Sequence, residues 1–420
     1  MIPYWFILVT LLLCKTGALS EQLWRGTSKV SSSTESFIGG DYVSIGIDVV
    51  VTLTSAVDNV LLLVNLNNKP REDNQYAQYT IFRNAAAICS GFMATVHSLS
   101  KEERQAVTFS FLDEPNETGS YTYSVRMKGT GIVSDSNQFR QIGAMVIPST
   151  VPTGTNTVPS VLEIKTTEYV DLGVAVKVTT SLTTDLVLVC ASFSINPLVD
   201  NAVAKISLFR DYDQVDTFAM QLVSMSRTGN NRMGSFFFVD SPANRGSISY
   251  SLRAAQSVSS PGGVSVSEGN TDMTQLSLVV VPAANAAFVT SEIARRITST
   301  SWIICGLSAT ITPLDATDTV LITVNINFYP ATTASVGMFT IFRDAQNLGH
   351  DSSGLQRVNT GEAAIATMSF LDSPNTSSPV TYTVKVRCHE TAKPFTVSYN
   401  GQTRQIAVIA SRALGRGILT

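Results

Sequence analysis

Charged residues are scarce in this chain of 420 residues, and their scarcity excludes several kinds of partner. Only 15% of the residues are charged, and 29 basic residues stand against 32 acidic ones, so the formal net charge is −3. An ordinary globular protein has about 25% charged residues. A surface that binds nucleic acid or an anionic membrane needs an excess of basic residues. We therefore expect no nucleic-acid partner.

Motifs for metal binding and catalysis are also missing. The three histidines are scattered, and the five cysteines include no Cys-x-x-Cys pair, so no zinc site is predicted. Glycine-rich phosphate loops, His-Glu-x-x-His and EF-hand patterns do not occur. His350, Asp351 and Ser352 are consecutive, and sequence neighbours cannot by themselves form a catalytic triad. The sequence predicts no cofactor, no metal, no catalytic residue and no enzymatic activity.

A long apolar run occurs only at the start of the chain. The run over residues 1–14 is shorter than the roughly 20 residues of a membrane-spanning helix, and Ala18-Leu19-Ser20 follows it. This pattern predicts a secretory signal peptide over residues 1–20, cut before Glu21. The mature protein would then be extracellular and have no membrane span. No basic residue precedes the run, and Lys15 follows it, so an uncleaved N-terminal anchor remains the alternative.

Four cysteines remain after removal of the signal peptide: Cys89, Cys190, Cys305 and Cys388. In an oxidising compartment they could form up to two disulfides, with three connectivities open. They do not fall at equivalent places in the repeats described below. Cys190 and Cys305 lie in apolar, strand-like runs, where a buried free thiol is equally ordinary.

What the chain does have is a threefold internal repeat. A Phe-Arg segment is followed by an aromatic segment that ends in aspartate, and the two are 30, 30 and 29 residues apart (Arg83 to Asp113, Arg210 to Asp240, Arg343 to Asp372). A tyrosine follows each aspartate by 10 residues (Tyr123, Tyr250, Tyr382). The arginines are offset by 127 and 133 residues. Such a period is that of whole domains in tandem rather than of solenoid units.

Each repeat reads as a β-domain. Short runs rich in Val, Ile, Thr, Tyr and Phe alternate with Gly, Pro, Asn and Ser, which is typical of an all-β sandwich or barrel. We predict three tandem antiparallel domains over residues 21–148, 160–282 and 288–410, followed by a tail at 411–420. The best helical candidate covers only residues 291–297.

The repeats resemble a jelly-roll module found in structural and fibre proteins of phages and algal viruses. The resemblance is sharpest in the third repeat, at residues 318–322, 339–348, 370–374 and 381–385. It implies a fold like that of the tumour-necrosis-factor jelly roll, with trimer-like packing. The viral modules carry glycine after Arg-Asp, whereas this chain has Asn84-Ala85, Asp211-Tyr212 and Asp344-Ala345.

The repeated Arg and Asp both lie at strand ends. We interpret Arg83–Asp113, Arg210–Asp240 and Arg343–Asp372 as structural ion pairs rather than ligand anchors, because the spacing recurs in every domain. Phe237 stands where the other repeats have Ser110 and Ser369. If the serine side faces outward, Phe237 lies on a domain or subunit contact; the alternative is that it is covered within its own domain.

Two sequons, Asn116-Glu117-Thr118 and Asn375-Thr376-Ser377, follow the x-Pro turn of the first and third repeats. Since an extracellular β-domain would expose this turn, we predict N-linked glycans on Asn116 and Asn375. In the second repeat Ala243 occupies the position.

The combined features indicate a secreted structural glycoprotein that associates with itself. We expect an extracellular filament, sheath or surface appendage, with a lectin-like adhesion protein or a capsid or fibre component of an algal virus as alternatives. The three domains either close into a pseudo-trimer or extend as beads that contact other chains. Divergence between the repeats favours open, head-to-tail contacts and a filament, with the tail reaching the next subunit.

Overall fold

The computed structural model describes residues 24–133, 138–158, 161–216, 221–225, 231–257, 262–266 and 272–411. The expected signal peptide and residues 412–420 of the expected tail lie outside these ranges. The regular secondary structure of the described residues consists of strands, apart from two 3-10 turns at Ala283–Asn285 and Tyr399–Gly401. The predicted all-β class is confirmed.

Domain 1 is a sandwich of two antiparallel layers. We call β1-β9-β3-β7 its inner sheet and β2-β8-β4-β6 its outer sheet, with β5 beside β4. The strands are β1 (Arg25–Ser31), β2 (Glu35–Leu53), β3 (Asn59–Lys69), β4 (Gln75–Arg83), β5 (Ala86–Ala87), β6 (Ala94–Ser98), β7 (Gln105–Asp113), β8 (Gly119–Val133) and β9 (Arg140–Ile147).

Domain 2 repeats this order. Its inner sheet is β10-β20-β13-β17 and its outer sheet is β12-β18-β14-β16. The strands are β10 (Thr153–Val158), β11 (Leu162–Ile164), β12 (Val170–Thr180), β13 (Leu186–Pro197), β14 (Ala202–Arg210), β15 (Asp213–Gln214), β16 (Gln221–Met225), β17 (Arg232–Asp240), β18 (Gly246–Gln256), β19 (Val264–Val266) and β20 (Thr274–Val281).

Domain 3 has the inner sheet β21-β33-β24-β30 and the outer sheet β23-β31-β26-β28. The strands are β21 (Ala286–Ser291), β22 (Arg295–Ile297), β23 (Ile303–Ile311), β24 (Thr319–Asn325), β25 (Asn327–Pro330), β26 (Gly337–Arg343), β27 (Gln346–Asn347), β28 (Gln356–Val358), β29 (Ala364–Ile365), β30 (Met368–Asp372), β31 (Val380–Cys388), β32 (Phe395–Val397) and β33 (Arg404–Ser411).

In every domain the first main strand lies beside the last, and the second beside the seventh. This is the strand order of an eight-stranded jelly roll. The domain limits differ from those expected, because β10 precedes residue 160 yet pairs with β20. Ser411 ends β33 rather than beginning a tail. The region 291–297 contains the end of β21 and β22, not a helix.

The two sheets of a domain differ in sequence pattern because they differ in what covers them. Outer strands such as β12 and β23 alternate buried and exposed residues, as expected for a sheet with one solvated face. Inner strands such as β13, β20 and β24 are buried at almost every residue. Both faces of each inner sheet are therefore covered over its middle strands, while the edge strands β1, β10 and β21 are partly exposed.

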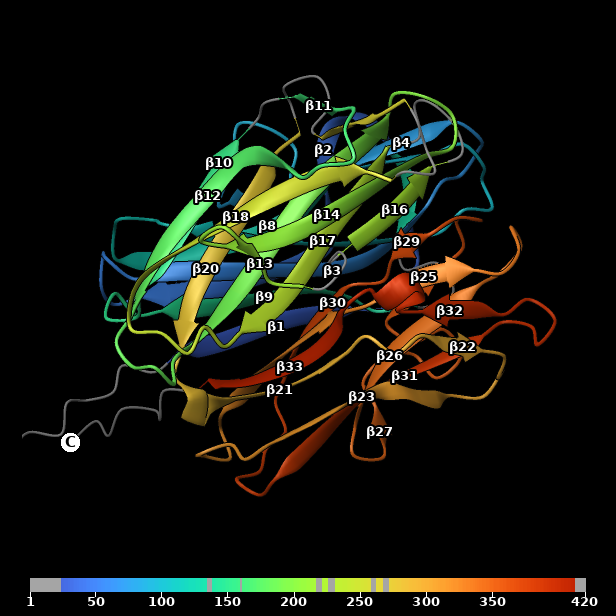
Figure 1. The fold of residues 1–420 in the computed structure, drawn as a ribbon. Coiled ribbons are helices and arrows are strands. Elements are labelled where there is room, and N and C mark those ends of the chain that lie inside the picture. Colours follow the sequence, from blue (N-terminus) through green and yellow to red (C-terminus); the bar gives the residue numbers. More distant parts are fainter. Residues whose placement is uncertain are drawn as a thin grey trace, which may run out of the picture.

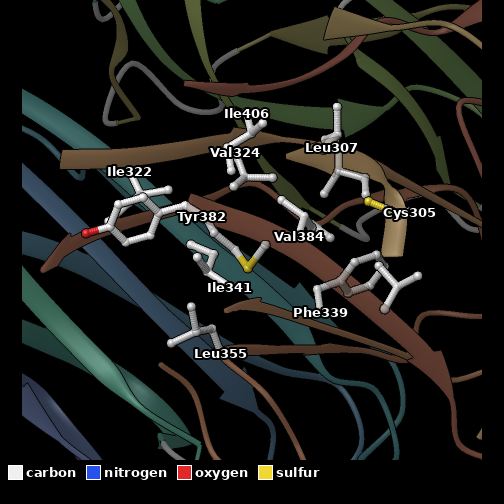
Figure 2. Close-up of a cluster of buried hydrophobic side chains, with 14 of the residues drawn as sticks. Cys305, Leu307, Ile322, Val324, Phe339, Ile341, Leu355, Tyr382, Val384 and Ile406 are labelled. Atoms are coloured by element: carbon white, nitrogen blue, oxygen red, sulfur yellow. The ribbon is translucent and has the colours of Figure 1, made fainter. Parts of the chain in front are cut away.

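Each sandwich encloses its own apolar core. In domain 3, Ile322, Val324 and Ile406 of the inner sheet meet Ile341 and Val384 of the outer sheet. Figure 2 shows these side chains between the layers. Figure 1 shows domain 3 in orange to red below domains 1 and 2, with the inner strands of all three domains turned toward the middle of the molecule.

Candidate functional site

The inner sheets of the three domains share a fourth apolar cluster, which we call the central core. Odd-numbered residues of β3, Leu61 and Leu63, belong to it, while Leu62 between them belongs to the core of domain 1. The same alternation holds on β13 and β24. The members are Trp24, Leu61, Leu63, Leu112, Met145, Ile147, Leu186, Leu188, Cys190, Phe237, Val239, Val279, Val281, Leu321, Leu371, Ala407 and Ile409.

The contacts between domains form a closed ring. Strand β7 of domain 1 packs on β13 of domain 2, β17 of domain 2 on β24 of domain 3, and β30 of domain 3 on β3 of domain 1. Because each domain uses one surface toward one neighbour and another surface toward the other, the ring has pseudo-threefold symmetry. The expectation of open domain contacts is wrong: the domains close into a pseudo-trimer within one chain.

A repeated glutamine clamps two of the three contacts. Gln141 Nε2 donates to the Leu371 carbonyl at 3.1 Å, and the Leu371 amide donates to Gln141 Oε1 at 2.9 Å. Gln405 makes the same pair of bonds to Val239, at 3.0 and 2.6 Å. Both side chains thus act like an added peptide group against a neighbouring strand. Gln275, the third copy, instead donates to Ser277 Oγ at 3.2 Å.

Phe237 lies in the central core and is 1% exposed. Its equivalents Ser110 and Ser369 are buried at the same contact, 1% and 2% exposed. The serine side of this strand therefore faces the neighbouring domains in every copy. The aromatic ring of Phe237 gives domain 2 a large apolar side chain in the central core, where the other two domains have a serine.

Hydroxyl groups also link the domains. Thr108 Oγ1 of domain 1 donates to the Thr367 carbonyl of domain 3 at 2.6 Å, and Thr367 Oγ1 donates to the Ser235 carbonyl of domain 2 at 2.8 Å. These three residues occupy the same place in β7, β17 and the segment before β30. The two bonds thus join domain 1 to domain 3 and domain 3 to domain 2.

The end of the molecule where β7 and β17 begin has a polar junction between the domains. Arg232 of domain 2 forms an ion pair with Glu362 of domain 3 at 3.2 Å, and the two side chains are 3% and 12% exposed. A cavity of about 410 Å³ lies beside it, lined by residues that include Glu102, Glu103 and Asn201. Burial raises the pKa of the Glu103 carboxyl.

The repeated Arg and Asp meet at the opposite end of each domain. Arg Nη1 lies 3.0, 2.8 and 3.0 Å from Asp Oδ2 in the pairs Arg83–Asp113, Arg210–Asp240 and Arg343–Asp372. The repeated tyrosine completes each cluster, since the hydroxyls of Tyr123, Tyr250 and Tyr382 donate to the same Oδ2 at 2.6, 2.6 and 2.8 Å. Burial, and after it the neighbouring aspartate, raises the pKa of these tyrosines.

These Arg-Asp-Tyr clusters join the two sheets of a sandwich. The aspartate ends an inner strand, whereas the arginine and tyrosine are opposite each other on outer strands, as Arg83 and Tyr123 are. Asn84, Asp211 and Asp344 follow the arginines with φ of 57°, 54° and 51°. Asn and Asp tolerate this left-handed conformation, so the turn after each arginine forms without glycine at these positions.

Both sequon asparagines are exposed and lie in the turn after the aspartate. Asn116 and Asn375 have φ of 60° and 55°, and each Nδ2 donates to the carbonyl two residues earlier, at 2.8 and 3.0 Å. Ala243 has the same conformation, with φ of 52°. All three turns have the same shape, but only two carry a glycan acceptor.

No family model matches this chain, and no curated protein matches it. Among solved structures, a chain from a study of the triple jelly roll fold and turret assembly in an archaeal virus is 10% identical, with 93% of this chain and 91% of that chain covered and a TM-score of 0.18. The infectious bursal disease virus Gx strain gives 11% identity, 93% and 82% coverage and a TM-score of 0.22. The VP2 subviral particle of that virus gives 10%, 93% and 82%, with a TM-score of 0.23.

These three chains are viral, and the matches also include a bacterial delta-endotoxin, Cry8Ea1 of Bacillus thuringiensis, at 10% identity and a TM-score of 0.20. At these TM-scores whole chains do not superpose, and the jelly-roll assignment rests on the strand order above.

Of the two states that the sequence left open for the cysteines, the structure has free thiols at Cys89, Cys190, Cys305 and Cys388. Cys89 lies beside the outer sheet of domain 1, Cys190 is in the central core, and Cys305 is in the core of domain 3. Burial raises the pKa of the Cys305 thiol to about 11. Cys388 also belongs to the core of domain 3. The buried cysteines behave as small apolar residues.

Two repeated features escaped the sequence reasoning. One is the glutamine at the start of each domain's last strand, at 141, 275 and 405. The other is an aromatic residue four positions before a glycine in β2, β12 and β23, at Gly46, Gly173 and Gly306. These glycines have φ of 73°, 75° and 92° and sit where the pairing register shifts. Both features were visible as matched positions in the repeats.

Within the described ranges, no group of three or more His, Cys, Asp or Glu could hold a metal ion. In the same ranges, no helix is long and apolar enough to cross a membrane.

Proposed function

We propose that this chain is a structural protein, a trimer prefolded within one polypeptide that serves as the repeating unit of a larger assembly. The observation that carries the proposal is the central core. It buries the middle strands of every inner sheet, so the outer sheets, the edge strands and the loops remain to meet other molecules. A unit of this kind needs no partner to complete its fold.

Contact between copies would use a set of exposed apolar side chains at one end of the unit. The loops after β2, β12 and β23 each carry one: Val57 is 65% exposed, Leu182 60% and Leu314 61%. These loops are equivalent in the three domains, so the pseudo-threefold ring places them at the same end. Each domain thus offers one exposed apolar side chain at this end, and we assign the contact to a second copy of the chain.

The unit would be exported and glycosylated. The apolar start of the sequence followed by Ala18-Leu19-Ser20 supports cleavage before Glu21. The exposure of Asn116 and Asn375 supports N-linked glycans at both. Peptide mapping of secreted protein would detect the start at Glu21 and both glycans. Intact residues 1–20 together with two bare asparagines would contradict this part of the proposal.

Electron micrographs and light scattering of the purified full-length chain test the assembly itself. We expect regular particles, sheets or filaments, which would distinguish a sheath or appendage from a viral coat or fibre. The triple variant Val57→Ser, Leu182→Ser, Leu314→Ser should remain folded but assemble less. If the parent chain stays monomeric at high concentration and does not differ from the triple variant, the proposed function is refuted.

A further inference from the structure

The outer sheet of domain 2 carries a groove of about 310 Å³. Strands β12 and β18 form its floor, and the turn after β14 forms one wall. The volume lies at the lower end of the range of small-molecule sites. The groove is separate from the central core and adjoins the Arg210-Asp240-Tyr250 cluster, because Asp211 and Tyr212 follow Arg210 in the chain.

The floor of the groove contains a hydroxyl that lacks a partner. Ser251 is 6% exposed, and its Oγ makes no hydrogen bond. A buried hydroxyl without a partner is costly, by roughly 1–3 kcal/mol. The cost would be relieved by a ligand that bonds to it.

Comparison with domain 3 explains why this hydroxyl is unpaired. There, Thr383 lies opposite Ser308, and their hydroxyls are 2.9 Å apart. In domain 2 the residue opposite Ser251 is Ala175, which has no polar group. In domain 3 the Thr383 hydroxyl has a partner on the neighbouring strand, whereas in domain 2 the equivalent Ser251 hydroxyl lies at the groove without one.

An exposed tyrosine stands beside this hydroxyl. Tyr212 lines the groove and is 85% exposed, although tyrosine rings are normally at least partly covered. The equivalent residues of domains 1 and 3 are Ala85 and Ala345. Domain 2 therefore differs from its sister domains in two neighbouring positions, and both differences favour a ligand.

The charges in the groove balance. Asp171 and Asp211 face Lys177 and Arg253. Each carboxylate uses Oδ1 to accept a backbone amide, from Gly173 at 2.8 Å and from Ser249 at 3.0 Å, which leaves Oδ2 available. A balanced groove with hydroxyl donors and carboxylate acceptors suits a neutral ligand rich in hydroxyls better than an anion or a cation.

We propose that this groove binds a neutral saccharide. Tyr212 stacks on the apolar face of a sugar ring, Ser251 bonds to one ring hydroxyl, and Asp171 and Asp211 accept bonds from others. This binding activity goes beyond the structural role and does not depend on it. A coat or sheath unit with this site would attach to glycans through domain 2, whose own turn at Ala243 has no sequon.

The test titrates the full-length chain with the methyl glycosides of glucose, galactose, mannose and N-acetylglucosamine, using saturation-transfer NMR and calorimetry. We expect at least one to bind. Tyr212→Ala, which copies domains 1 and 3, should weaken binding about tenfold through the lost stacking. Ala175→Ser, which supplies the partner found in domain 3, should weaken it several-fold. Both residues are exposed, so melting curves should not change.

The matched control is Ala85→Ser in domain 1, which alters a residue equivalent to Tyr212 without touching the groove and should leave binding intact. If none of the four glycosides binds, or if both groove variants bind as the parent does, the site is not there. If sulfate or phosphate binds instead and the glycosides do not, the groove is an anion site and the saccharide assignment is wrong. None of these outcomes depends on whether the chain assembles.

Discussion

Replacing Phe237 by alanine should destabilise the whole chain rather than one domain. The ring is 1% exposed and packs among residues of all three inner sheets. A fully buried phenylalanine truncated to alanine costs about 3–5 kcal/mol, and the cost rises when the surroundings cannot collapse. Here the surroundings are strands of three sandwiches, each held by its own core. We therefore expect a loss near the upper end, about 4–5 kcal/mol.

The assay is denaturant unfolding followed by circular dichroism and by tryptophan fluorescence. Trp24 belongs to the central core and is 5% exposed, so in a Trp302→Phe background its emission reports the separation of the domains. In the parent both signals should change together. In Phe237→Ala the fluorescence change should come at lower denaturant, before the domains themselves unfold.

The control is Phe288→Ala on β21, because Phe288 is 36% exposed. It removes the same atoms from a half-solvated place and should cost about 1 kcal/mol or less. Equal midpoints for Phe237→Ala and the parent, or equal losses for both variants, would mean that the central core does not hold the domains together.

Three further predictions concern the clusters, the pH and the tail. Asp372→Ala leaves Arg343 and the buried Tyr382 hydroxyl without their shared acceptor and should destabilise domain 3 by about 3 kcal/mol, while Tyr382→Phe should cost about 1 kcal/mol, as chemical unfolding would measure. A normal melting curve combined with lost ligand binding would instead give the pair a binding role. Burial raises the pKa of Tyr123, Tyr250 and Tyr382 in the folded chain. The stability is therefore retained below about pH 10 and falls as the pH rises above it, because only the unfolded chain can ionise these tyrosines there. Ultraviolet titration should show these tyrosines ionising only on unfolding, and ionisation in the folded chain would contradict their burial. Deleting residues 412–420 should weaken assembly seen by light scattering and leave the melting temperature unchanged, and identical sedimentation of both forms would exclude a role for the tail.

Much of each domain was predictable from local pattern. The alternation in β12 and β23 and the unbroken apolar runs in β13 and β24 follow from whether one or both sheet faces are covered. The recurrence of Arg83 and Asp113 at fixed spacing predicted a repeated ion pair, because residues that must meet cannot change their separation along the strands, whereas the bond from Tyr123 to the same aspartate was not predicted. The pairing of the sheets within a domain follows from such spacing.

The arrangement of the domains was not predictable in this way. Phe237 and Gln141 act on residues more than a hundred positions away, and no period in the sequence connects a glutamine to the backbone it clamps. Divergence between repeats argued for open contacts, yet a ring within one chain has no need for identical copies, since each contact occurs only once.

The strands, the threefold repeat and the Arg-Asp pairs could be predicted from the sequence, because these depend on periodicity and short spacing; the tyrosine that completes each pair could not. Only the tertiary structure decided that the three inner sheets close on one another, and that Ala175 leaves the Ser251 hydroxyl unpaired beside Tyr212. The packing of the domains and the cross-strand partners depend on which surfaces meet in space. Because these surfaces have similar compositions, their partners cannot be predicted from the sequence.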